Sequence, residues 1–183
     1  MSTSTTTLPA GTWELDAAHS SVSFSVRHLM VSKVRGQFTD FTADIVTAED
    51  PLASKVSAVV QMASIDTRDS GRDEHLRTND FFDAENHPTI DYKATGVKVK
   101  GDNYVVLGEL TIRGTTKPIE LFLELNGVGV DAYGKTRAGL TLTGSFNRKD
   151  FGVSWNNTLD NGGVAVGDKV GVELDLAVIL REQ

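Results

Sequence analysis

Two histidines follow an aspartate closely enough to form an acid–base pair. Asp16 precedes His19 by three residues, and Asp73 precedes His75 by two. A carboxylate that orients an imidazole is a common arrangement for moving a proton near neutral pH. An enzyme that uses one of these pairs on a bound substrate is therefore one hypothesis, and it requires the pair to lie in a cleft with perturbed pKa values.

Other catalytic motifs are missing from the sequence. The chain has no cysteine, which excludes a thiol nucleophile, a cysteine zinc site and an iron–sulfur cluster. No His-Glu-x-x-His motif occurs, and His75 and His87 stand twelve residues apart across a change of structure. Residues 127–132 match a loose Gly-x-Gly-x-x-Ala pattern, but they lie at a hairpin with no helix after them. We therefore expect no catalytic residue and no metal.

Charge and hydropathy exclude further classes of protein. A formal net charge of −7 over 183 residues has the wrong sign for binding phosphates, so neither nucleic acid nor an anionic membrane surface is an expected partner. No apolar run approaches the ~20 residues that cross a bilayer. The polar start, Met1 to Thr7, lacks the apolar run of a leader peptide. We expect a disordered polar tail over residues 1–10, one domain over 11–183, and a cytoplasmic protein with no integral membrane segment.

The elements that position these side chains follow a period of two. Apolar residues alternate with polar ones over 170–181, and shorter alternating stretches cover 21–27, 56–62, 119–126 and 138–147. Such strands are buried on one face, which is typical of antiparallel sheets. Roughly eight strands fit between Thr12 and Arg181.

Short turns connect the predicted strands. Turn residues occur at 101–103, 114–116 and 131–134, so neighbouring strands are expected to be antiparallel. The charged, non-alternating stretch near residues 69–79 predicts a short helix, with Asp69 or Ser70 as its N-cap. Residues 136–147 could span nearly 40 Å at ~3.3 Å per residue, which favours a tall barrel over a sandwich. An eight-stranded barrel is either filled by side chains or holds one small ligand, and periodicity leaves both open.

Several motifs in order resemble the YceI-like family. They are Gly11–Asp16 with His19-Ser20, Val22–His28, Val34–Phe38, Arg72–Leu76 leading into Asp80–Asp83, His87–Ile90, Gly108–Gly114 and Asn147–Gly152. The resemblance implies an all-β fold, an extended eight-stranded antiparallel lipocalin-like barrel, whose interior binds a polyisoprenoid or similar long amphiphile, often as a dimer. Many members are periplasmic with a cleaved leader, and the polar N-terminus departs from that pattern.

We expect the ligand to lie against the inward-facing apolar side chains of the strands. This predicted lining comprises Phe24, Val26, Phe38, Ile45, Val60, Met62, Ile90, Tyr92, Leu110, Leu121, Leu123, Leu140, Leu142, Phe146, Leu174 and Leu176. Four aromatic residues in irregular segments either plug a barrel end or gate its mouth: Phe81, Phe82, Phe151 and Trp155. Trp13 is expected to pack at the barrel base, where its indole N–H needs a partner.

Charged residues near the strand ends are candidates for a polar headgroup. The candidates are His19, Arg27, Arg35, Arg72 and Arg148, with His28 and His75 as further possibilities, and each is also a candidate for solvation or structural pairing. Arg72 with Asp73, and Arg148 with Asp150, are predicted ion pairs that fix loops. Phe122 and Ile179 are apolar on otherwise polar faces and suggest a dimer seam or an interaction module. The sequence therefore favours non-catalytic binding, sequestration or transport of a polyisoprenoid or similar long-chain amphiphile, such as an isoprenoid quinone, a prenyl phosphate or a fatty amide. An enzyme and a filled interaction module are the alternatives.

Overall fold

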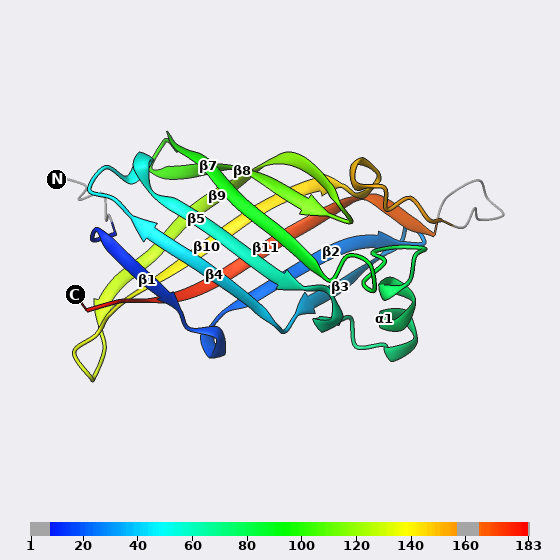
Figure 1. Cartoon of the computed structure of the whole chain (residues 1–183), viewed down its shortest axis with the longest axis horizontal. Helices are drawn as coiled ribbons and strands as arrows, with labels where there is room; N and C mark the ends of the chain where they lie inside the picture. The colour runs from blue at the N-terminus through cyan, green and yellow to red at the C-terminus, as the bar shows by residue number, and fades with distance from the viewer. Residues whose placement is uncertain (1–7, 157–164, 183) are drawn as a thin grey trace.

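The computed structural model describes residues 8–156 and 165–182, which form a closed antiparallel β-barrel (Figure 1). The ring is closed because β1 pairs with both β4 and β11. Its eight strands, in spatial order, are β1 (Gly11–Leu15), β4 (Phe41–Thr47), β5 (Lys55–Gln61), β7 (Thr89–Lys100), β8 (Asn103–Ile112), β9 (Thr115–Val130), β10 (Thr136–Asn147) and β11 (Val166–Leu180). The predicted eight-stranded antiparallel barrel is confirmed.

Three short strands lengthen the barrel at one end. They are β2 (Ser21–His28), β3 (Ser32–Phe38) and β6 (Ile65–Asp66). The second half of β11 pairs with β1 and its first half with β2, so β1 and β2 act as one interrupted strand. The same relation holds for β4 with β3 and for β5 with β6. The long β7 to β11 strands are therefore matched by composite strands on the other side of the barrel.

The connections follow local turn and cap chemistry. Helix α1 (Ser70–Arg77) begins at the predicted cap, where the Asp69 carboxylate accepts a hydrogen bond from the Arg72 N–H at 3.0 Å. Gly101, Gly114 and Gly134 have positive φ in three hairpin turns, which glycine adopts without steric cost. Four 3₁₀ helices complete the described elements: η1 (Ala17–His19), η2 (Pro51–Ala53), η3 (Met62–Ser64) and η4 (Arg148–Phe151).

The predicted tail begins to contact the barrel before residue 10. Residues 1–7 lie outside the described part of the chain, but Leu8 packs against the core, and the Pro9 carbonyl accepts a hydrogen bond from the Thr47 hydroxyl at 2.7 Å. The same hydroxyl accepts the indole N–H of buried Trp13 at 3.0 Å. The indole therefore has the partner that its burial at the barrel base requires.

Buried side chains form three clusters inside the barrel. The largest surrounds Trp13, Leu140 and Val178, while smaller clusters around Met62 and around Phe151 lie beside α1. Glycines in the wall make room for large side chains, because a Cβ at Gly108 would overlap the Tyr92 ring and one at Gly36 would overlap the Phe24 ring. Among the described residues, no helix is long and apolar enough to span a bilayer.

Candidate functional site

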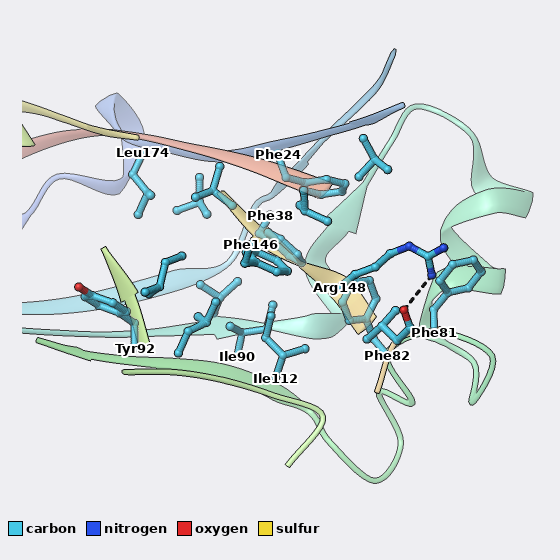
Figure 2. Close-up of a pocket in the computed structure, with 18 of the residues that line it drawn as sticks. Phe24, Phe38, Phe81, Phe82, Ile90, Tyr92, Ile112, Phe146, Arg148 and Leu174 are labelled. Carbon is cyan, nitrogen blue, oxygen red and sulfur yellow. Dashed lines mark hydrogen bonds between the residues drawn. The ribbon is translucent and has the colours of Figure 1, made fainter. Parts of the chain in front are cut away.

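An apolar cavity of about 170 Å³ occupies the half of the barrel next to α1 (Figure 2). It runs from Tyr92, inside the barrel, to Phe81, Phe82 and Arg148 at the end. Its wall exposes no polar surface to the cavity. Twelve of the predicted lining and aromatic residues contribute to it: Phe24, Val26, Phe38, Val60, Phe81, Phe82, Ile90, Tyr92, Leu110, Leu121, Phe146 and Leu174.

A second cavity of about 90 Å³ lies in the opposite half of the barrel, against Leu8 and η2. Five predicted residues line it: Ile45, Leu123, Leu140, Leu142 and Leu176. Buried Leu121 and Val106 belong to the large core cluster and line the first and the second cavity respectively. The interior is therefore divided, with a hollow part near α1 and a more filled part beyond it.

Three predicted contact residues line neither cavity. Met62 and Phe151 are almost fully buried in the two small core clusters. Trp155 packs on His75 and Phe81, with ring-centroid distances of 4.9 and 5.2 Å. Phe151 and Trp155 therefore pack against other side chains, whereas Phe81 and Phe82 line the cavity, and plugging or gating by these four residues stays a prediction.

Part of the lining of the larger cavity was not predicted from the sequence. Val170 and Val172 lie in phase with Leu174 on β11, so the alternation that identified Leu174 could also have identified them. Leu76 on α1 and Val153 lie outside any alternating segment, and no periodic signal marks them. The other unpredicted lining residues of this larger cavity are Val22, Ala58, Ile112, Ile119 and Val166.

Among the headgroup candidates, only Arg148 lines the cavity. It is 3% exposed, and burial lowers the pKa of its guanidinium. Its N–H groups donate to the carbonyls of Gly167 and Val153 at 2.8 Å, and of Trp155 at 2.9 Å. Backbone carbonyls therefore fix the Arg148 guanidinium at the end of the cavity.

The other headgroup candidates lie elsewhere. His19, Arg27 and Arg35 are exposed, and none of them lines either apolar cavity. Arg72 donates to the hydroxyl and the carbonyl of Thr67, both at 2.8 Å.

Both predicted loop ion pairs are wrong in detail. Asp73 accepts hydrogen bonds from Thr67, whose hydroxyl also accepts from Arg72, so Arg72 and Asp73 are joined through Thr67. Arg148 has its carboxylate neighbour in Asp168, at 3.9 Å, rather than in Asp150. Sequence proximity predicted direct pairs, whereas the nearby Thr67 joins the first two side chains and the distant Asp168 lies beside Arg148.

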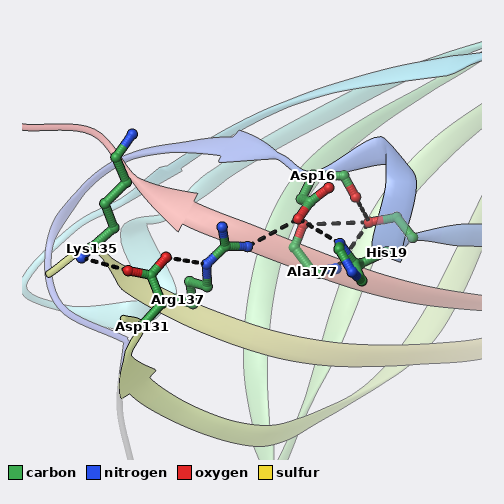
Figure 3. Close-up of polar contacts among 7 residues, drawn as sticks. Asp16, His19, Asp131, Lys135, Arg137 and Ala177 are labelled. Carbon is green, nitrogen blue, oxygen red and sulfur yellow. Dashed lines mark hydrogen bonds and ion pairs between the residues drawn. The ribbon is translucent and has the colours of Figure 1, made fainter. Parts of the chain in front are cut away.

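Neither predicted acid–base pair lines the apolar cavities. His75 bonds to Asp80 at 2.8 Å rather than to Asp73. His19 and Asp16 do pair at 2.8 Å, but Arg137 also bonds to the Asp16 carboxylate, at 2.9 Å (Figure 3). These partners, His19 first, lower the Asp16 pKa, which weakens it as a base. None of these residues lines either cavity.

Arg137 also bonds to Asp131 at the β9–β10 hairpin, at 2.6 Å. Chiefly through this bond, the pKa of Asp131 falls from 3.8 to about 2. A lowered folded-state pKa stabilises the fold above the unfolded value, and this contribution is lost as pH falls through the window from about 4 to about 2. In Arg137→Met, we expect the Asp131 titration midpoint, measured by carboxyl NMR shifts, to rise towards 3.8. An unchanged midpoint would contradict this pairing, and Arg181→Met is the matched control.

The Tyr92 hydroxyl is buried with no hydrogen-bond partner among the described residues. Burial raises the pKa of Tyr92 to about 12. An unsatisfied buried polar group costs ~1–3 kcal/mol. Tyr92→Phe is therefore expected to increase the free energy of unfolding in denaturant by about 1 kcal/mol. Tyr133→Phe, at an 88% exposed position, should leave it unchanged, and destabilisation by Tyr92→Phe would contradict the prediction.

Two further expectations concern the outer surface. Phe122 is exposed and Ile179 half-buried, but their β10 neighbours, Thr143 and Arg137, are six residues apart, or about 20 Å along the strand. They therefore do not form one apolar patch.

Among residues 8–156 and 165–182, no three His, Asp or Glu side chains gather as metal ligands.

A closed eight-stranded antiparallel barrel with an apolar, partly hollow interior defines the class of lipocalin-like barrel proteins. Comparison with known families narrows this class, because the YceI-like domain matches residues 13–178. The chain belongs to the YceI-like family.

Relatives and solved structures agree with this assignment. A UPF0312 protein of Photorhabdus laumondii is 39% identical over 139 residues, which cover 75% of this chain and 72% of that protein. The crystal structure of BcnA from Burkholderia cenocepacia has a TM-score of 0.78 at 21% identity and covers 90% of this chain and 99% of BcnA. A polyisoprenoid-binding domain from Saccharophagus degradans has a TM-score of 0.69 at 16% identity, with coverage of 92% and 98%. At these identities, the two structures show the shared fold.

Proposed function

We propose that the protein binds, and thereby sequesters or carries, a polyisoprenoid or similar long-chain amphiphile inside the barrel, without covalent chemistry. The observation that supports it most is the 170 Å³ cavity beside α1, whose wall exposes only apolar surface. Membership of the YceI-like family and the structural likeness to a polyisoprenoid-binding domain support the same ligand class.

The energetics of such a complex need no reactive group. Burying a hydrocarbon chain gains ~0.8 kcal/mol per methylene, so ~20 carbons would give an upper bound of about 16 kcal/mol. The loss of free motion on association and the ordering of the complex cost ~4–15 kcal/mol, which offsets part of that gain. The difference, about 1–12 kcal/mol, includes the ~8 kcal/mol of micromolar binding, so this affinity is attainable when most of the chain is buried.

The size of the cavity sets a condition on the complex. A cavity of ~150 Å³ lined by aliphatic and aromatic side chains holds one benzene-sized molecule, so 170 Å³ is too small for a long chain in one rigid arrangement. A long ligand must therefore join the two cavities by moving the side chains between them or extend past Phe81 and Phe82. An isoprenoid, a quinone or a fatty amide would meet this condition through its tail.

The enzyme and interaction-module alternatives receive less support. The acid–base pairs lie outside the cavities, and Phe122 and Ile179 lie apart on the outer surface. Dimerisation remains a prediction from the family resemblance.

Extraction of the purified protein tests the proposal. The protein is purified without detergent, extracted with organic solvent, and the extract is analysed by mass spectrometry. We expect a long-chain isoprenoid, quinone or fatty amide, and we expect added prenyl lipid to raise the melting temperature of delipidated protein. An empty extract together with an unchanged melting temperature would refute the proposal.

A further inference from the structure

The β2–β3 turn exposes three consecutive large apolar side chains. Leu29, Met30 and Val31 are 41%, 58% and 86% exposed. Most exposed apolar residues of a folded protein are scattered singly, whereas a contiguous exposed group is a candidate contact surface.

The backbone of this turn is one that leucine and methionine rarely adopt. Leu29 and Met30 have φ values of 51° and 62°, and the Val31 N–H donates to the His28 carbonyl at 3.2 Å. Two successive residues with positive φ favour Asn-Gly, because bulky side chains strain this conformation. The chain thus has strained, exposed apolar residues at positions where the turn conformation favours Asn and Gly. Such a mismatch between residue type and local conformation is typical of functional positions.

The hairpin is basic although the whole chain is acidic, so the net charge, from which no anionic membrane partner was expected, does not describe this part of the surface. Residues 17–39 contain no Asp or Glu but include Arg27, Lys33 and Arg35, in a chain of net charge −7. Arg27 and Lys33 lie opposite each other across the hairpin, and both are exposed. The nearby Asp168 carboxylate is engaged by Lys149 at 3.3 Å.

The tip borders the outer end of the apolar cavity. His28 pairs with Val166, which lines the cavity, and the Leu29 N–H donates to the Ala165 carbonyl at 2.9 Å. Val26, two residues before His28, also lines it. The turn lies at the same end of the barrel as α1 (Figure 1).

We propose that Leu29, Met30 and Val31 insert into an anionic lipid bilayer while Arg27, Lys33 and Arg35 contact its headgroups, which brings the cavity end to the membrane. This inference rests on the proposed function, because it supplies the surface from which an apolar ligand reaches the interior. Apolar residues beside cations bind interfaces through apolar burial and attraction to anionic lipid. Helix α1, which carries Asp73 and Glu74, lies at the same end (Figure 1), so the attraction comes from the hairpin rather than from this end as a whole.

Co-sedimentation with vesicles tests this proposal. We expect the protein to bind vesicles of phosphatidylcholine with one third phosphatidylglycerol, and to bind pure phosphatidylcholine at least tenfold more weakly. The double variant L29N/M30G should lose most of this binding and melt at a higher temperature, because Asn-Gly relieves the turn. In R27Q/K33Q, the loss of each cation should weaken vesicle binding about fivefold, so the double variant should bind anionic vesicles roughly 25-fold more weakly than the wild type.

A matched control uses the opposite end of the barrel. Val130 and Tyr133 are 71% and 88% exposed near the β9–β10 turn, and V130S/Y133S should bind anionic vesicles as the wild type does. Absence of wild-type binding, or full binding by L29N/M30G, overturns the docking surface. Binding of prenyl lipid by the wild type is measured in parallel in solution without vesicles. If the wild type binds no prenyl lipid, the proposed function is refuted. If it binds prenyl lipid but not vesicles, only the docking surface is refuted.

Discussion

Val172→Phe is expected to weaken ligand binding about 100-fold. Val172 lies on β11 and lines the larger cavity. Phenylalanine adds four carbons and fills space that the same number of ligand carbons would occupy, at ~0.8 kcal/mol each, or ~3 kcal/mol in all. The measurement is the Kd of a fluorescent prenyl lipid for delipidated protein.

The same substitution outside the barrel provides the control. Val99 on β7 is 61% exposed, so Val99→Phe should bind the lipid as the wild type does. Because the added ring occupies existing space, Val172→Phe should fold normally, with an unchanged or higher melting temperature. A Kd for Val172→Phe within threefold of the wild type would show that the chain lies elsewhere.

Trp13→Ala is expected to have the largest effect on stability. Trp13 is 2% exposed, lies opposite Ile45 of β4 and Leu180 of β11, and so packs where the barrel closes. Truncation of a buried Trp costs ~3–5 kcal/mol. For a chain of this length, that corresponds to a fall in melting temperature of roughly 10 °C, measured by circular dichroism.

Two further variants separate packing from hydrogen bonding at this position. Thr47→Val leaves the indole N–H without its acceptor and should cost ~1–3 kcal/mol. Trp155→Ala, at a half-buried position near α1, should cost less than Trp13→Ala. A loss below about 1 kcal/mol in Trp13→Ala would contradict the role of Trp13 in closing the barrel.

Much of the fold is predictable from the sequence because strand alternation and turn chemistry are local. The buried face of β10, with Ala138, Leu140 and Leu142, follows directly from a period of two. The interruption between β1 and β2 by η1 is less visible, because it depends on both segments pairing with the same strand, β11. The Asp69 cap of α1 was predictable because it needs only neighbouring residues.

The candidate site was predictable where it lies on strands and not where it depends on packing between distant loops. Alternation placed Leu174 and Ile90 inside the barrel, but it carries no information on whether the space between them is filled. The division of the interior depends on side-chain volumes from several strands, among them Val106 of β8 and Leu121 of β9. Arg148 illustrates the second limit, because two of its carbonyl partners, Val166 and Gly167, lie 18 and 19 residues further along the chain and reach it only in the folded protein.

The central claim is that a hydrocarbon chain lies inside the barrel beside α1. Isotope-filtered NMR with methyl-labelled protein and an unlabelled prenyl lipid tests it most directly. The account predicts intermolecular NOEs from the chain to the methyl groups of Ile90, Val172 and Leu174. NOEs confined to exposed Val99 and Val130, with none to these inner methyl groups, would contradict it.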